Sequence, residues 1–508
     1  MKKIVLSTIA ALTLSTVTLS AAAFTLYEDA NGQVFTKPGA GRTEMIITTD
    51  MITNTVQKEE SYSTPKLTNE EKEEIKQEII AEVKKDKSSG KSSGVKMISI
   101  MDDKSPTFLL GKQTHINMKF VPQDNPDMWL KVGVRVQGTM ESKQVEYDNP
   151  AKADTDEYDA YLRRVRLEIA AGFGHGLSFV MDIRNDKSNY GIENDEGKFS
   201  VGDAYLKIKK PFDTSLVNFK LYRGKIDVSR TETVKSARVI AYDRPYVADI
   251  AAQYISFNRR GANIQMYGDY EKKVHYQVAF GSATSPDKIK DAAGGKQSSA
   301  AEVTDQSFFY GGKIVLSPFD GWEEKKRTET YFGRGKHFEI GAGYWVVPSM
   351  EGTVTNSLGN DVKYDLEHKL INLEASMHYH GLFLQAEYFK FKDAVSSWTT
   401  NTNGTPLGLN DKLNTGDANG WYVTGEYVMP ELGYIAPFFR YEKDDKFEKA
   451  DDAELTSTMV GMNWYLKGNT IKTGIYYQED DYGDDVVEMG GDYGKKVKYF
   501  RLTSQFFF

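Results

Sequence analysis

Basic side chains recur at alternate positions of several candidate strands, and such side chains could bind anions. They are Lys131, Arg135, Arg164, Arg166, Arg184, Lys207, Lys209, Lys220 and Arg259. The same strand faces carry three acids, which are Glu168, Asp182 and Asp203. Arginine binds phosphate-like oxygens in bidentate geometry, and lysine supplies a compact positive charge. If these faces line a narrow passage, their local charge outweighs the formal net charge of −8 of the whole chain.

A second group of basic residues lies in a long connection between the fifth and sixth candidate strands, at about residues 226–255. It comprises Arg230, Lys235, Arg238 and Arg244, among Ala-rich and aromatic stretches that are able to pack. A barrel of sixteen strands leaves a wide aqueous channel unless something narrows it. We therefore expect this third long loop to fold inward, and its basic residues to form the constriction.

The sequence gives little support for catalysis, metal binding or nucleic-acid binding. The chain has no cysteine, which excludes thiol catalysis and thiolate metal ligation. His378 and His380 have no matching ligands nearby for a metal site, and no serine in a recognisable motif accompanies His378 as a hydrolase would require. The acidic balance argues against a nucleic-acid partner. We expect neither enzymatic activity nor a cofactor.

Period-two alternation predicts the elements that position these residues. The last strand is typical: Phe500, Leu502 and Phe506 lie on one face, opposite Arg501 and Thr503. The predicted strands are 129–139, 159–170, 176–184, 201–210, 216–225, 256–268, 273–282, 305–317, 336–347, 366–379, 382–391, 420–429, 433–443, 456–466, 470–479 and 497–508. Residues 114–120 also alternate, which predicts an additional strand outside the barrel proper.

The connections between these strands alternate between long and short. His380-Gly381 is a short turn, whereas 318–335 is long where a short turn is due. Short turns at one end and long loops at the other are typical of outer-membrane barrels. Residues 128–508 are therefore predicted to form a 16-stranded antiparallel transmembrane β-barrel, an all-β fold.

The N-terminal part differs from the barrel. Residues 1–23 combine two lysines, an apolar stretch and a small-residue cleavage region, which predicts a cleaved signal peptide and export to the outer membrane. Residues 24–127 are predicted to be a periplasmic segment with one helix at 68–86. Thr68 and Glu71 form its capping box, and a Ser/Gly/Lys linker follows it.

Several motifs resemble the phosphate-selective porin O and P family over roughly residues 113–508. They are Tyr161-Leu-Arg-Arg-Val-Arg166, Asp203-Ala-Tyr205, Arg223-Gly224, Asp243-Arg244, Asn258-Arg259-Arg260-Gly261 and Gly461-Met-Asn-Trp-Tyr465. The resemblance implies a homotrimeric porin that passes anions by diffusion, with an arginine ladder and a constriction containing lysine and aspartate. Asp203 matches the acid at the start of the fourth strand, and the basic group of the third loop falls near Arg230 or Lys235.

The predicted function is passive diffusion of small anions, such as phosphate or other oxyanions. The expected partners are these anions, outer-membrane lipid and lipopolysaccharide, and further copies of the chain. The candidate pore-lining and anion-binding residues are Arg135, Arg164, Arg166, Arg184, Asp203, Lys207, Lys220, Arg230, Lys235, Arg238 and Arg259. A non-selective porin and a structural or adhesive barrel remain as alternatives.

Overall fold

The computed structural model describes a set of segments that covers most of the predicted barrel. These are residues 24–29, 34–35, 42–47, 95–99, 118–148, 150–188, 199–255, 260–282, 301–319, 328–332, 336–355, 361–395, 415–445, 454–483 and 495–507. The chain divides into two compact units, Met1–Lys91 and Ser92–Phe508. The expected signal peptide, the helix at 68–86 and its linker lie outside the described residues, so they stay predictions.

The first unit contains a small antiparallel sheet. Its strands are β1 (Phe24–Asp29), β2 (Val34–Phe35) and β3 (Arg42–Ile47), in the order β2-β1-β3.

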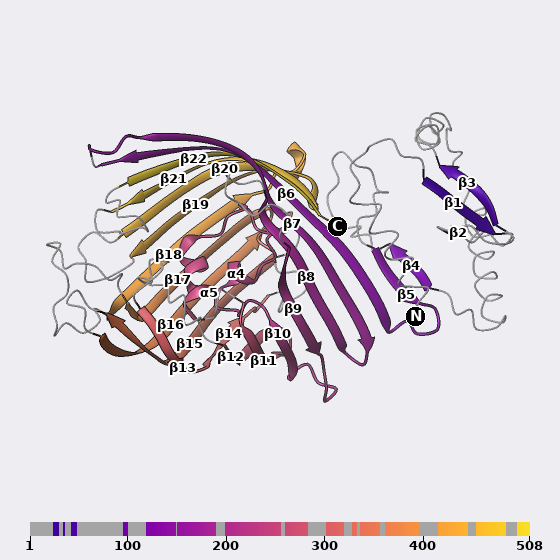
Figure 1. Ribbon diagram of the computed structural model, residues 1–508, viewed down its shortest axis with the longest axis horizontal. Helices are drawn as coiled ribbons and strands as arrows, with labels where there is room; N and C mark the ends of the chain where they lie inside the picture. The colour runs from indigo at the N-terminus through magenta and orange to yellow at the C-terminus, as the bar shows by residue number, and fades with distance from the viewer. Residues whose placement is uncertain are drawn as a thin grey trace. The chain divides into compact units, whose positions relative to one another are not determined.

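The second unit is a closed antiparallel barrel of sixteen strands among the described residues (Figure 1). Its strands are β6 (Met128–Tyr147), β7 (Thr155–Gly174), β8 (Leu177–Ser188), β9 (Ser200–Ile208), β10 (Asn218–Arg223), β11 (Ala262–Tyr270), β12 (Val274–Gly281), β14 (Phe309–Leu316), β15 (Lys336–Thr355), β16 (Asp361–Tyr379), β17 (Leu382–Val395), β18 (Thr415–Tyr427), β19 (Ile435–Asp445), β20 (Glu454–Asn469), β21 (Ile471–Tyr482) and β22 (Lys495–Phe507). β13 (Ala301–Gln306) pairs with the far end of β15 and continues the line of β14. Each of the sixteen predicted strands overlaps one of these.

The last strand closes the barrel. β22 pairs antiparallel with β6, from Lys495 opposite Tyr147 to Phe507 opposite Arg135. Beyond that point, the same edge of β6 pairs with β5 (Met118–Pro122), and β4 (Val95–Ser99) pairs with β5. The additional strand predicted near residues 114–120 therefore exists as β5. Because β4 and β5 join the barrel sheet, the second unit begins at Ser92, whereas the sequence suggested a boundary at residue 128.

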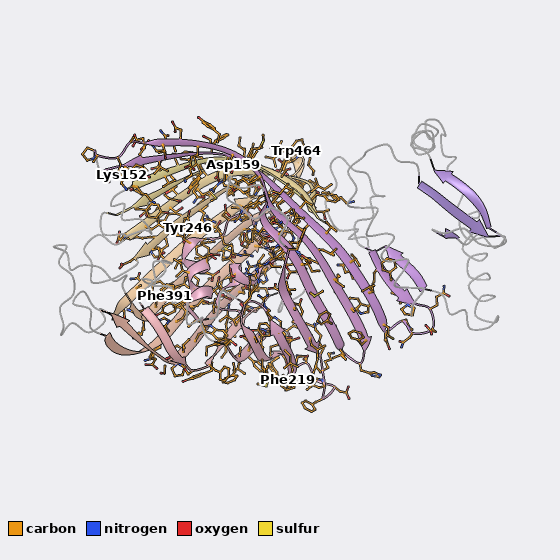
Figure 2. All side chains as sticks on the ribbon, viewed as in Figure 1. Lys152, Asp159, Phe219, Tyr246, Phe391 and Trp464 are labelled. Atoms are coloured by element: carbon orange, nitrogen blue, oxygen red, sulfur yellow. The ribbon has the colours of Figure 1, made fainter. Side chains whose placement is uncertain are left out.

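The barrel is polar inside and apolar outside. In β11 the apolar Ile264 is 52% exposed, while the neighbouring Asn263 and Gln265 are buried. Leu221 of β10 is 44% exposed, and Phe219 lies at the outer edge of the barrel in Figure 2. A water-soluble protein would hide these apolar side chains, whereas a barrel in lipid exposes them and turns its polar face to the lumen.

Helical structure is sparse in the described part of the barrel unit. It consists of α4 (Arg230–Thr233), α5 (Tyr246–Ile255) and a short 3₁₀ helix at Pro430–Leu432. Ser229 caps α4, because its hydroxyl accepts a hydrogen bond from the Glu232 N–H. No helix in the described segments is long and apolar enough to cross a membrane.

Candidate pore-lining site

A polar cavity of about 550 Å³ lies beside strands β6 to β9. Its wall includes side chains from β6, β7, β8 and β9, from β19, β21 and β22, and from the connection between β10 and β11. That connection comprises residues 224–261 and is called the third loop below. Some of the residues that line this cavity were predicted from the sequence to line the pore, and others were not.

Six of the predicted residues line this cavity. They are Arg135, Arg164, Arg166, Arg184, Asp203 and Lys235. Arg135 is buried, donates to Ser236 Oγ at 2.8 Å and forms an ion pair with Glu168. The Lys235 ammonium lies 2.7 Å from the other Glu168 oxygen, and 52% of its side chain is exposed. One carboxylate therefore orients a buried guanidinium of the wall and an exposed ammonium of the third loop.

Three further arginines of this wall also have acidic partners. Arg166 pairs with Asp186 at 2.6 Å, whereas Arg184 lies 3.9 Å from the same carboxylate. Arg260 Nε donates to Asp203 Oδ1 at 2.7 Å. The shorter of these charge-assisted contacts fix the orientation of the Arg166 and Arg260 guanidinium planes.

A β-bulge accounts for an arginine that the alternation pattern placed on the wrong face. Gln137 of β6 pairs with Arg164, and the next residue of β6, Gly138, pairs with Leu162, so Arg163 is an extra residue in β7. A bulge of this type reverses the faces of the residues beyond it. Arg163 and Tyr161 therefore line the cavity, whereas strict alternation assigned both positions to the lipid face.

Asp243 of the third loop gathers several arginines. Arg163 Nε donates to its Oδ1 at 3.0 Å, and Arg501 Nη1 lies 3.5 Å from its Oδ2. Arg440 Nη1 donates to the Asp243 carbonyl oxygen at 2.8 Å. Burial by itself would raise the pKa of Asp243, but Arg163 and Arg501 outweigh burial and hold that pKa well below its usual range. This carboxylate therefore stays charged, and its contribution to stability is lost only as the pH falls below about 4.

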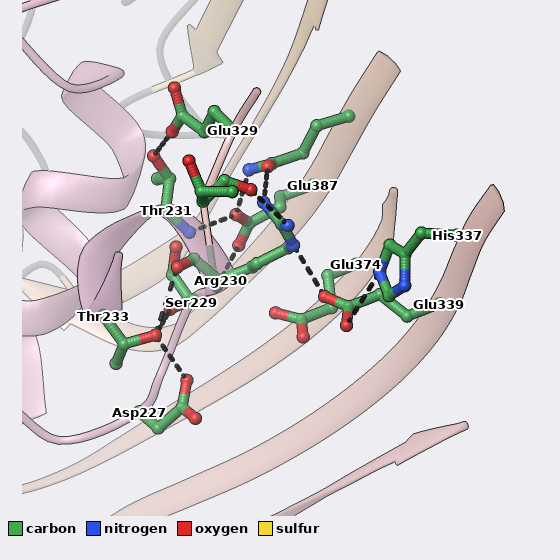
Figure 3. Close-up of polar contacts among 12 residues, drawn as sticks. Asp227, Ser229, Arg230, Thr231, Thr233, Glu329, His337, Glu339, Glu374 and Glu387 are labelled. Carbon is green, nitrogen blue, oxygen red and sulfur yellow. Dashed lines mark hydrogen bonds and ion pairs between the residues drawn. The ribbon is translucent and has the colours of Figure 1, made fainter. Parts of the chain in front are cut away.

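Arg230 occupies a different place from the one expected. Its side chain is fully buried and lies 2.6 Å from a carboxylate oxygen of Glu339 on β15 (Figure 3). Its guanidinium also donates to Gln385 Oε1 at 2.6 Å and to the Thr328 carbonyl at 2.9 Å. A side chain without exposed surface does not fit the role of a direct ligand for passing anions. Arg230 instead anchors the third loop.

The remaining predicted residues lie outside the described cavity wall. Lys220 is placed 3.9 Å above the Tyr222 ring, and Lys207 lies 5.6 Å from the Tyr205 ring. The carbonyl of Arg238 accepts hydrogen bonds from Glu329 and Thr328. Arg259 lies outside the described residues.

Strands β15 to β21 carry an acidic inner face, which sequence reasoning missed because it assigned lumen charges only in the first six strands. The buried acids are Glu339, Glu374, Glu387, Glu426, Glu442, Asp444 and Asp480. Several of them accept hydrogen bonds from the third loop. Glu387 accepts from the backbone N–H groups of Arg230 and Thr231, at 3.3 and 3.0 Å, and Glu442 accepts from the N–H of Val247 at 2.6 Å.

Backbone carbonyls of the third loop accept hydrogen bonds from β6, β21 and β22. Gln137 of β6 donates to the Ser236 carbonyl at 3.1 Å, and Gln505 of β22 donates to the Ala237 carbonyl at 2.9 Å. Lys472 of β21 donates to the carbonyl of Val239 at 2.7 Å. The barrel thus satisfies polar groups of a loop backbone that would otherwise be costly to bury.

The cavity wall contains eleven basic and eight acidic side chains among its described lining residues. The excess of three positive charges is smaller than the sequence suggested, because acids from the third loop and from β6 and β8 join the wall. Arg501 and Arg440 come from the C-terminal strands, and the polar face of the terminal strand was the signal that could have revealed Arg501.

Comparison with known proteins identifies the family. The family model of the phosphate-selective porins O and P matches residues 131–506, which is most of the barrel unit. The chain belongs to the phosphate-selective porin O and P family. Its family and its barrel identify it as an outer-membrane porin.

The chain is also similar, at low sequence identity, to a curated protein and to solved structures. An uncharacterized protein of Aquifex aeolicus (strain VF5) is 24% identical over 423 residues, which cover 75% of this chain and 90% of that protein. Among solved structures, an anion-selective porin from Comamonas acidovorans is 10% identical with a TM-score of 0.49, covering 75% of this chain and 100% of that chain. The outer membrane channel DcaP of Acinetobacter baumannii is also 10% identical with a TM-score of 0.49, covering 77% and 99%.

Proposed function

We propose that this porin passes small anions, such as phosphate and other oxyanions, through the cavity beside β6 to β9. The observation that carries the proposal is the cavity wall, with eleven basic and eight acidic described side chains. Arg184 and Lys235 are the basic groups best placed to meet a solute, because the ion pair of Arg184 with Asp186 is long, at 3.9 Å, and Lys235 is half exposed. An anion can exchange between such groups as it moves along them.

The proposal includes an inward-folded third loop that narrows the lumen. Its support is the set of partners around the barrel: the loop contacts Gln137 of β6, Glu387 of β17 and Glu442 of β19. Buried inward-facing groups of strands that far apart in the barrel order can share one loop only if the loop crosses the interior. A large barrel without such a loop would be a wide, weakly selective channel.

Reversal potentials across a KCl gradient in planar bilayers test the proposal. We expect the purified protein to form channels with an anion-directed reversal potential. Lys235→Glu should shift the potential toward cations, because it removes a positive charge from the wall and adds a negative one. Lys273→Glu makes the same charge change in the turn between β11 and β12, outside the described cavity wall, and should leave selectivity nearly unchanged.

The other outcomes separate the alternatives. A potential near zero that is insensitive to Lys235→Glu would indicate a non-selective porin, and a cation-directed value would contradict the proposal. Absence of channels would favour a structural or adhesive barrel. The homotrimer and the contact with lipopolysaccharide stay predictions, and chemical cross-linking of the purified protein tests the trimer.

A further inference from the structure

The connection between β14 and β15 breaks the rule of short turns at its end of the barrel. The neighbouring turns at that end span residues 271–273 and 380–381, whereas this one spans 317–335. Within it, Thr328, Glu329 and Thr330 are buried. A surface turn has no reason to bury a charged side chain, so this segment has a different role.

Glu329 binds two separate parts of the third loop. One of its carboxylate oxygens accepts a hydrogen bond from Thr231 Oγ1 at 2.7 Å, and the other accepts from the Ile240 N–H at 2.6 Å. The Glu329 N–H donates to the Arg238 carbonyl at 3.1 Å. A single residue thus connects α4 to the stretch that lies nine residues later in the chain. Figure 3 shows Glu329 beside Thr231, close to the Arg230 cluster.

The flanking residues hold Glu329 in place from the barrel side. The Thr328 hydroxyl accepts a hydrogen bond from Nδ2 of Asn469, the last residue of β20, at 3.3 Å. The Phe332 ring meets the Tyr465 ring edge-on, with centroids 5.0 Å apart. Phe332 has a φ of 55°, a left-handed conformation that a bulky residue adopts only where its surroundings enforce it.

Tyr331 adds a contact to the neighbouring strands. Its ring stacks on His337 of β15, with centroids 5.5 Å apart, and lies 4.8 Å from the His378 ring of β16. The segment 328–332 is therefore fixed to β15, β16 and β20 and, through Glu329, to the third loop. Ala237 and Val239 lie next to the loop residues that Glu329 binds. Their backbone carbonyls accept hydrogen bonds from side chains of β22 and β21, respectively.

We propose that Thr328–Phe332 is a second insert, entering from the end of the barrel opposite to the third loop. Together with residues 230–240 it closes the β15–β22 side of the lumen, so that solutes pass only through the cavity beside β6 to β9. Glu329 is the positioning residue of this closure. The inference rests on the proposed function, since it specifies which part of the barrel conducts.

The test compares Glu329→Gln and Thr231→Val with wild type in planar bilayers and in liposome-swelling assays with neutral sugars of increasing size. Glu329→Gln removes the charge and leaves one acceptor oxygen for two donors, and Thr231→Val removes one of those donors. Losing charge-assisted hydrogen bonds should raise the population of displaced-loop states roughly tenfold to hundredfold. We expect more frequent high-conductance events and a larger sugar cut-off. Glu431→Gln, an exposed acid in a turn at the same end, is the matched control.

Folding is monitored separately by the heat-dependent shift of the barrel on gels. If Glu329→Gln fails to fold, Thr231→Val carries the test, because it replaces a hydroxyl by a methyl group of the same shape. Conductance and sugar cut-off equal to wild type in the folded variants would overturn the inference while leaving the anion channel intact. A wild-type protein without channels would overturn the proposed function, and this inference with it.

Discussion

Arg230 is a basic residue whose role is to anchor the third loop and not to bind a solute. Its guanidinium and Glu339 are both buried, and they lie 2.6 Å apart. Arg230→Gln removes the guanidinium from the buried Glu339 carboxylate, which should cost about 3–5 kcal/mol of unfolding free energy. We expect urea unfolding from lipid vesicles to occur at a lower denaturant concentration.

The double variant Arg230→Gln, Glu339→Gln is the control for this prediction. It removes both charges together, so part of the lost stability should return. A single variant as stable as wild type would show that the ion pair contributes nothing to the anchoring of the loop. A double variant less stable than both singles would show that the two residues act independently.

At the residue scale, the sequence predicted side-chain faces well wherever strands alternate without interruption. Arg135 and Arg166 face the cavity as the pattern indicated. Arg163 could not be placed, because a bulge depends on pairing with β6 and leaves no mark in the alternation of β7 alone. The burial of Arg230 was hidden for a similar reason, since its acidic partners lie more than a hundred residues away.

Helix α5 packs against the barrel through a close approach at Gly420 of β18. A Cβ atom at this position would lie 2.7 Å from Val247 Cγ2 and 2.9 Å from Asp444 Oδ1. Gly420→Ala should therefore push α5 away from β18, at a cost of about 1–3 kcal/mol. Looser packing should increase trypsin cleavage at the basic residues of the third loop, which mass spectrometry of the fragments would measure.

Gly138→Ala on β6 is the matched control, because no atom lies within 4 Å of its added Cβ. We expect its trypsin pattern to equal that of wild type. Unchanged cleavage in Gly420→Ala would mean that the wall yields to the extra methyl group, and that α5 does not depend on this glycine.

At the element scale, the strands were predictable and the helices of the third loop were not. Strands can be recognised in a sequence because apolar and polar side chains alternate with a period of two, which lipid on one face of the barrel wall imposes. α5 spans ten residues, too few to be stable without tertiary contacts, and it is held by strands such as β16 and β19. The inner faces beneath it carry Leu370, Phe389 and Tyr422, all buried. Where the loop covers these strands, their inner faces carry apolar side chains among the buried acids, which blurs their alternation.

At the scale of the whole molecule, basic and acidic side chains gather on different sides of the barrel interior. The arginines of β6 to β8 lie along the cavity, whereas the acids of β15 to β21 are buried and several bind the third loop. A formal net charge of −8 is therefore compatible with an anion pathway, because most of these inner acids accept hydrogen bonds from the third loop or form an ion pair with it. The division between an arginine-lined side and a side that binds the third loop could not be predicted from composition.

This distribution predicts an anion preference that depends strongly on salt. The described cavity wall has eleven basic and eight acidic side chains, so most of its charges are paired and the net field is modest. The Debye length falls from about 10 Å at 0.1 M salt to about 3 Å at 1 M, and screening reduces a net field much more than it reduces direct contacts. Reversal potentials measured at one KCl ratio should therefore be clearly anion-directed near 0.1 M and approach zero near 1 M.

Lys235→Glu distinguishes two explanations of selectivity. One is the net electrostatic field of the cavity wall, and the other is direct contact between anions and side chains that are already paired. If the net field selects, this variant should lose most of its anion preference at low salt and resemble wild type at high salt. A wild-type preference that persists unchanged at high salt would contradict the field argument. Selectivity would then come from direct exchange of anions with groups that are already paired, such as Arg166 and Asp186, since contacts at 2.6 Å lie inside the screening length at any of these concentrations.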